Sequence, residues 1–79
     1  MEFDREKMRE RREALGMTQE QLARMLAVTH NYIYMLEKGR KIPGINMIND
    51  LSQALKIDPL SLLIIKEGGE NNAENPAKS

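Results

Sequence analysis

Apolar and polar positions in the first five sixths of the chain follow the spacing of short amphipathic helices. The pattern is clearest at residues 45–55, whose apolar side chains recur three or four positions apart: Ile45, Ile48, Leu51 and Leu55. No stretch alternates with a period of two, and glycines and prolines fall between the apolar segments. The pattern therefore predicts an all-α fold of five helices, at about residues 5–15, 19–26, 30–38, 45–55 and 59–66.

Capping residues support four of these five helix starts. A polar cap accepts a hydrogen bond from a backbone N–H of the first turn, and an apolar residue before the cap packs onto the helix. Such pairs precede four predicted helices, with caps at Asp4, Thr18, Thr29 and Asp58. Thr18 also has Gln21 three positions later, which completes a capping box, and Pro59 occupies a favoured first helical position.

Two predicted helices are joined by a connection of only three residues. Residues 27–29 separate the helix at 19–26 from the helix at 30–38, and helix-turn-helix units have a turn of this length. Ala23 is small enough for a close crossing of the two helices. The expected buried seam consists of Leu22, Leu26, Val28, Ile33 and Leu36, and four methionines, Met8, Met17, Met25 and Met47, are expected as core filler. The residues expected to lie off the core are His30, Asn31, Tyr32, Tyr34 and Met35.

Length and composition limit the chain to one small intracellular domain. A chain of 79 residues buries a thin core, and with no cysteine it has no disulfide framework. The charged N-terminal segment has no apolar region typical of a signal peptide, and no apolar stretch is long enough to span a bilayer. We therefore expect residues 1–66 to form a cytoplasmic domain and residues 67–79, which are polar, to form a flexible tail.

Net charge does not by itself indicate a nucleic-acid partner. The formal net charge is zero, whereas DNA-binding domains commonly carry a basic excess. Residues 1–41 carry a net charge of +2 and residues 42–79 a net charge of −2. The difference leaves room for a local basic face. Arg5, Lys7, Arg9 and Arg11 alternate with acidic residues, which is typical of a solvated helix face.

The run at residues 12–43, REALGMTQEQLARMLAVTHNYIYMLEKGRKIP, resembles the Cro/CI-type (XRE-like) helix-turn-helix family, which includes the lambda repressor. The motif MTQEQLA, followed by V-T-x-x-x-I-x-x-L-E-x-G, carries the resemblance, which extends from about Met8 to Leu63. It implies a compact five-helix, lambda-repressor-like domain. Such domains bind operator DNA as two-fold dimers and place the recognition helix in the major groove.

The resemblance also implies a role for individual residues. It places at base edges His30, Asn31 and Met35, and at phosphates Thr18, Gln19, Arg40 and Lys41. Tyr32 and Tyr34, which flank the base-reading positions, are added as base-contacting candidates. Asn31 is suited to bidentate contact with adenine, Met35 to the thymine methyl group and His30 to donation toward guanine. Arg12 and Glu37 match a structural ion pair. Three positions depart from the family pattern: Ala27, Ser52 and Lys56.

The apolar residues near the end of the domain leave two interpretations open. If residues 59–66 are helical, Leu62 and Ile65 face the core, and Leu60, Leu63 and Ile64 are partly exposed. These three are candidates for a homodimer interface, although a thin core could also use them all.

The predicted function is sequence-specific DNA binding by a dimeric transcriptional regulator of bacterial or phage origin, acting as a repressor on a palindromic operator. The alternative is an antitoxin or adaptor that binds another protein through residues 59–66 or the tail. His30 is the only histidine, and no metal set, cofactor site, small-molecule site or nucleophile–base pair is evident, so we expect no enzyme.

Overall fold

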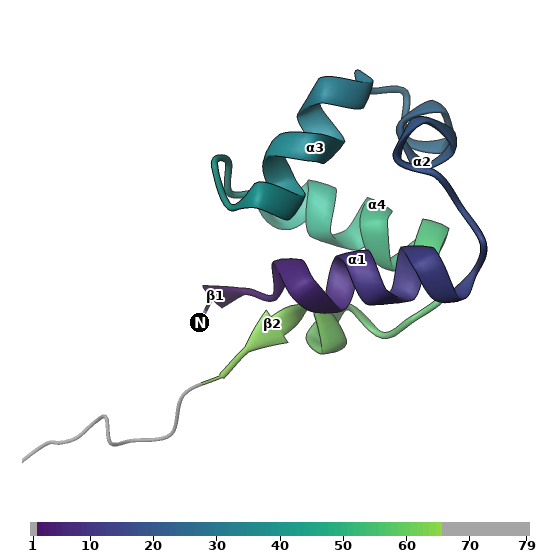
Figure 1. Cartoon of the computed structure of the whole chain (residues 1–79). Helices are drawn as coiled ribbons and strands as arrows, with labels where there is room; N and C mark the ends of the chain where they lie inside the picture. The colour runs from purple at the N-terminus through teal and green to yellow at the C-terminus, as the bar shows by residue number, and fades with distance from the viewer. Residues whose placement is uncertain (1, 66–79) are drawn as a thin grey trace, which may run out of the picture.

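The computed structural model describes residues 2–65, so the predicted tail at 67–79 lies outside the described residues. The elements follow one another as β1 (Glu2–Phe3), α1 (Arg5–Ala14), α2 (Gln19–Leu26), α3 (His30–Lys38), α4 (Ile45–Leu55), the 3-10 helix η1 (Pro59–Leu62) and β2 (Leu63–Ile64). In Figure 1, α2 and α3 lie at the top and α1 with the two strands at the bottom; α1 packs against α3, and α4 packs against both α1 and α2.

The four α-helices agree with the predicted ranges because their ends are encoded locally. Asp4, Thr18 and Thr29 each accept a hydrogen bond from a backbone N–H three residues later, and Thr18 and Gln21 complete the capping box. Gly39 ends α3 in the left-handed conformation, at φ 76°. These caps satisfy the backbone groups that a helix end leaves without intrahelical partners.

The fold is mostly helical as predicted, but the prediction of a fifth helix at 59–66, and with it the count of five helices, is wrong. Pro59–Leu62 form one 3-10 turn, capped as expected by Asp58, and Leu63–Ile64 then pair with Glu2–Phe3 in a two-stranded antiparallel sheet. The backbone N–H of Asp4 also donates to the Leu62 carbonyl at 2.7 Å. Pairing supplies backbone partners to both ends of the domain, which a helix at 59–66 would not do for residues 2–4.

The core is formed by side chains from every helix. The fully or nearly buried apolar residues are Met8, Leu22, Ala23, Ile33, Leu36, Ile48, Leu51, Ala54, Leu55 and Leu62. Leu26 and Val28 pack against this cluster while remaining partly exposed. Three residues expected in the core are exposed instead: Met25, Ile45 and Ile65. Ile45 is the first residue of α4, at the edge of the packed region, and Ile65 leaves the core because it follows a strand rather than continuing a helix.

The turn between α2 and α3 contains an alanine in a backbone conformation that is unfavourable for any residue except glycine. Ala27 adopts a left-handed conformation with φ 58°, and the next residue, Val28, donates its N–H to the Ala23 carbonyl. Lys56 ends α4 in the same way, with φ 57°. For a residue with a Cβ atom, this conformation costs on the order of 1 kcal/mol. Tertiary packing of the helices on either side offsets that cost at both positions.

Candidate nucleic-acid interface

One face of α3 is left free for a partner. Ile33 and Leu36 are fully buried, which fixes the rotation of the helix about its axis. His30, Asn31 and Tyr34 are consequently exposed. Their side chains lie on the first two turns of the second helix of a helix-turn-helix unit, the part of such a unit that approaches base edges.

The structure does not bring all five predicted base-contacting residues onto this face. Tyr32 is half-buried and packs against the core cluster, so the expectation that it lies off the core is wrong. Tyr32 lies four positions before the buried Leu36, so the two side chains share one face of α3. Met35 is also half-buried, because it lies between the exposed face and the buried Leu36.

A buried ion pair fastens α3 to α1. Arg12 Nε lies 2.7 Å from Glu37 Oε2, and a second guanidinium nitrogen lies 3.2 Å from Glu37 Oε1. Arg12 also donates to the Met17 carbonyl at 2.7 Å. The Glu37 side chain is only 4% exposed. These are the two residues that the sequence matched to a structural ion pair, and their contacts connect three segments of the chain.

Gln19 extends this ion pair toward the exposed face. Its side-chain nitrogen donates to Glu37 Oε1 at 2.9 Å, and its side-chain oxygen lies 3.0 Å from His30 Nε2. The side chain of Gln19, predicted to contact phosphate, is therefore held by two protein partners. Thr18, the other predicted phosphate contact on α2, uses its hydroxyl oxygen to cap the helix.

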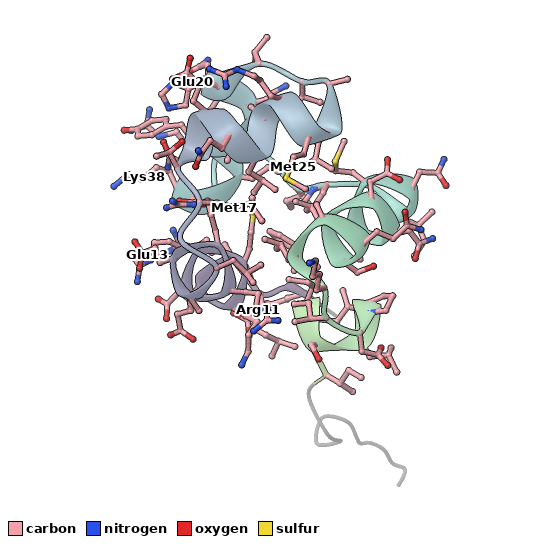
Figure 2. The ribbon with its side chains drawn as sticks, turned by 90° about the vertical axis from the view of Figure 1, so that its right-hand side faces the viewer. Arg11, Glu13, Met17, Glu20, Met25 and Lys38 are labelled. Atoms are coloured by element: carbon pink, nitrogen blue, oxygen red, sulfur yellow. The ribbon has the colours of Figure 1, made fainter. Side chains whose placement is uncertain are left out.

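The exposed charges on α3 and on the segment that follows it, residues 30–41, are positive despite the zero net charge of the chain. Between residues 21 and 49 the sequence contains one acidic residue, Glu37, and its side chain is buried and paired. Over the same range Lys38, Arg40 and Lys41 are exposed, and Lys38 Nζ lies 5.7 Å from the centre of the Tyr34 ring. Figure 2 shows Lys38 pointing outward from the molecule. Because Glu37 is buried and paired, the exposed charged side chains in this range are basic. The net charge of +2 over residues 1–41 understates this local excess.

Two arginines interpreted as part of a solvated face have defined partners. Arg5 donates to the Glu37 carbonyl at 3.2 Å, and Arg11 donates to the Leu55 carbonyl at 2.8 Å. Each guanidinium thereby binds a carbonyl near the C-terminal end of a helix, where the helix dipole favours a cation. Figure 2 shows Arg11 at the end of the molecule away from Glu20. No sequence signal indicated these contacts, because the partners lie far away along the chain.

The three candidates for a dimer interface are not equivalent. Leu60 is 63% exposed and Ile64 is 38% exposed, whereas Leu63 is half-buried and packs against the core. Ile65, which was expected inside, is exposed beside them. The free apolar surface at this end of the domain therefore comprises Leu60, Ile64 and Ile65.

Within residues 2–65, no group of three or more His, Cys, Asp or Glu side chains is placed to hold a metal ion. In the same part of the chain, no helix is long and apolar enough to cross a membrane. The arrangement supplies polar, aromatic and basic side chains on one surface, which is the chemistry of a nucleic-acid interface.

Comparison with known proteins agrees with this geometry. The family model described as helix-turn-helix matches residues 8–62. An uncharacterised HTH-type transcriptional regulator from Methanothermobacter thermautotrophicus is 38% identical over 63 residues, covering 78% of this chain and 91% of that protein. A second such regulator, from Sinorhizobium medicae, is 33% identical over 70 residues, which is half of its own length.

A solved structure shows the same fold. The restriction-modification controller protein C.AhdI from Aeromonas hydrophila superposes with a TM-score of 0.71 at 32% identity, covering 75% of this chain and 89% of that one. The family model, the relatives and the solved structure all point to transcription regulation. The chain belongs to the Cro/CI-type (XRE-like) helix-turn-helix family of DNA-binding transcriptional regulators.

Proposed function

We propose that the chain binds a palindromic operator as a homodimer, on nucleoid DNA in the cytoplasm, and represses transcription by occupying it. The observation that carries this proposal is the exposed first half of α3, bordered by positive charges and by no exposed carboxylate between residues 21 and 49. In a two-fold dimer, two such helices enter successive major grooves about 34 Å apart.

Individual roles follow from the chemistry of the exposed groups. Asn31 offers an amide that can bond adenine through two atoms, and the partly exposed Met35 can contact a thymine methyl group. Arg40 and Lys41 lie in the segment that follows α3, where a cation can contact the sugar–phosphate backbone. A phosphate can also bind the backbone N–H groups at the start of α2, where the helix dipole favours an anion.

The dimer interface in this proposal is the apolar surface of Leu60, Ile64 and Ile65, with Leu63 at its border. Large exposed apolar side chains that adjoin one another commonly mark a protein interface. Isologous contact across a two-fold axis would let the same surface serve both protomers.

Binding to duplexes selected from a random pool tests the DNA proposal. If each protomer neutralises about four phosphates, the logarithm of the association constant falls with the logarithm of salt at a slope near −7. Asn31→Ala is expected to weaken the selected site by about 1–3 kcal/mol and to leave non-specific binding nearly unchanged. Lys41→Ala is expected to weaken all duplexes alike. A slope near zero on every duplex would contradict DNA binding.

Sedimentation of the full chain tests the dimer. Leu60→Glu is expected to raise the monomer fraction, because it places a charge in the apolar surface, whereas Met25→Glu, at an exposed position on α2, is the matched control. Equal sedimentation of both variants and the original chain would contradict this interface. A monomer that binds no duplex but co-purifies with a toxin-like protein would favour the alternative function, an antitoxin or adaptor.

A further inference from the structure

Four side chains form a continuous series of hydrogen bonds from α1 to the first residue of α3. The series runs from Arg12 to Glu37, from Glu37 to Gln19 and from Gln19 to His30. An ionised carboxylate can only accept hydrogen bonds, and Glu37 also accepts from the Arg12 guanidinium. The Gln19 atom that faces Glu37 must therefore be the amide nitrogen.

This direction determines which nitrogen of His30 carries a proton. With its amide nitrogen committed to Glu37, Gln19 turns its amide oxygen toward His30 Nε2, at 3.0 Å. An amide oxygen has no proton to give, so Nε2 must be the donor. A neutral imidazole has one N–H group, and Nδ1 is therefore left as an acceptor. His30 is exposed at the start of α3, so this acceptor belongs to the candidate interface.

We propose that His30 is a specificity-determining residue that accepts a hydrogen bond through Nδ1 from the exocyclic amino group of a base. In the major groove the bases that carry such a donor are adenine, at N6, and cytosine, at N4. Donation to guanine, the role expected from the sequence, would require the proton on the other ring nitrogen. Gln19 is then a positioning residue that sets the tautomer of His30. This inference rests on the proposed DNA-binding function.

Nitrogen NMR of the full chain tests the tautomer without any ligand. His30 is the only histidine, so ¹⁵N-histidine labelling gives one pair of ring signals at a pH of about 8.5, where an imidazole is neutral. The expected result is protonated Nε2 and unprotonated Nδ1. In Gln19→Met, with folding checked by circular dichroism, a measurable share of the Nδ1–H form is expected. A protonated Nδ1 in the original chain, or an unchanged tautomer in Gln19→Met, would overturn the proposal.

Base analogues test the contact itself. Selection from a random pool with the original chain, His30→Ala and Glu10→Ala first identifies the base pair whose preference depends on His30; Glu10 is exposed on α1 and serves as the control. Duplexes are then made with purine for adenine or 2-pyrimidinone for cytosine at that pair, which removes the amino group. The original chain is expected to lose affinity about 2- to 10-fold, and His30→Ala to lose none.

The possible outcomes distinguish a failure of the His30 inference from a failure of the proposed DNA-binding function. A His30-dependent loss with 7-deazaguanine, but not with the amino-deleted bases, would show donation to guanine and overturn the inference alone. An identical base preference for His30→Ala and the original chain would also overturn it alone. Failure of the original chain to enrich any duplex would overturn the proposed function and the inference together.

Discussion

The helix-turn-helix unit at residues 18–38 and the C-terminal segment at residues 58–64 begin with the same local signals and end as different structures. Thr18 and Asp58 both follow an apolar residue and both accept a hydrogen bond from the backbone of the next turn. The first cap opens a helix of eight residues, whereas the second opens a single 3-10 turn that leads into a strand. A cap therefore determines where a helix starts and not how far it continues.

The residues after each cap explain the difference. Along α2 and α3, buried apolar positions recur at helical spacing and most exposed positions are polar, so one face packs and the other is largely solvated. The segment Leu62–Ile65 is apolar at every position, so a helix there would expose apolar side chains on all but one side. Ile64 and Ile65 are also β-branched, which favours strands. Pairing with residues 2–3 satisfies this strand preference and lets Leu63 pack against the core, while Ile64 and Ile65 stay exposed.

The largest expected effect comes from breaking the attachment of the helix-turn-helix unit to α1. Arg12→Ala leaves the buried Glu37 carboxylate without its cation and removes the bond to the Met17 carbonyl. We expect a loss of about 3–5 kcal/mol in the free energy of unfolding, measured by urea denaturation. The matched control is Arg9→Ala, an exposed arginine on the same helix, with an expected change within about 0.5 kcal/mol. Similar losses for both variants would contradict the role of the ion pair.

The C-terminal segment provides the second test. Leu62 is fully buried, and Leu62→Ala is expected to lower the free energy of unfolding by about 2–5 kcal/mol. Leu60, two positions earlier, is exposed, and Leu60→Ala is expected to change it by less than about 0.5 kcal/mol. The measurements are made at low protein concentration so that any dimer is dissociated. Comparable losses at the two positions would contradict the observed burial of this segment.

Removing the caps compares the two regions directly. Thr29→Ala removes the hydroxyl that caps α3 and is expected to cost about 0.5–2 kcal/mol. Asp58→Ala is expected to cost less, because the turn it caps has only four residues. Thermal denaturation of both variants measures the difference. A larger loss for Asp58→Ala would show that the C-terminal segment depends on its cap more than α3 does.

The smallest effect is a gain in stability at the left-handed turns. Ala27→Gly and Lys56→Gly each relieve a residue at positive φ, and each is expected to stabilise the fold by up to about 1 kcal/mol. The control is Ala14→Gly, in the last turn of α1, where the same change is expected to be destabilising by about 0.5–1 kcal/mol. A loss of stability in Ala27→Gly would mean that the added conformational entropy of the unfolded chain outweighs the strain that glycine removes from the turn.

The sequence alone was sufficient for the parts of this protein that depend on contacts within about one helical turn. The helix starts at Asp4, Thr18 and Thr29, the three-residue turn and the placement of His30 and Asn31 at the start of α3 all depend on neighbours three or four positions away. Hydrogen bonds and side-chain spacing at that range are visible as patterns of residue types.

Only the tertiary structure decided the features that join distant segments. The pairing of residues 2–3 with 63–64, the bond from Arg11 to a carbonyl 44 positions away and the concealment of the Glu37 charge have no local signature. The same holds for the direction of the hydrogen bonds through Gln19 to His30. Such contacts form because packing of the apolar faces has already brought the partners together, so their presence depends on the completed fold and not on neighbouring residues in the chain.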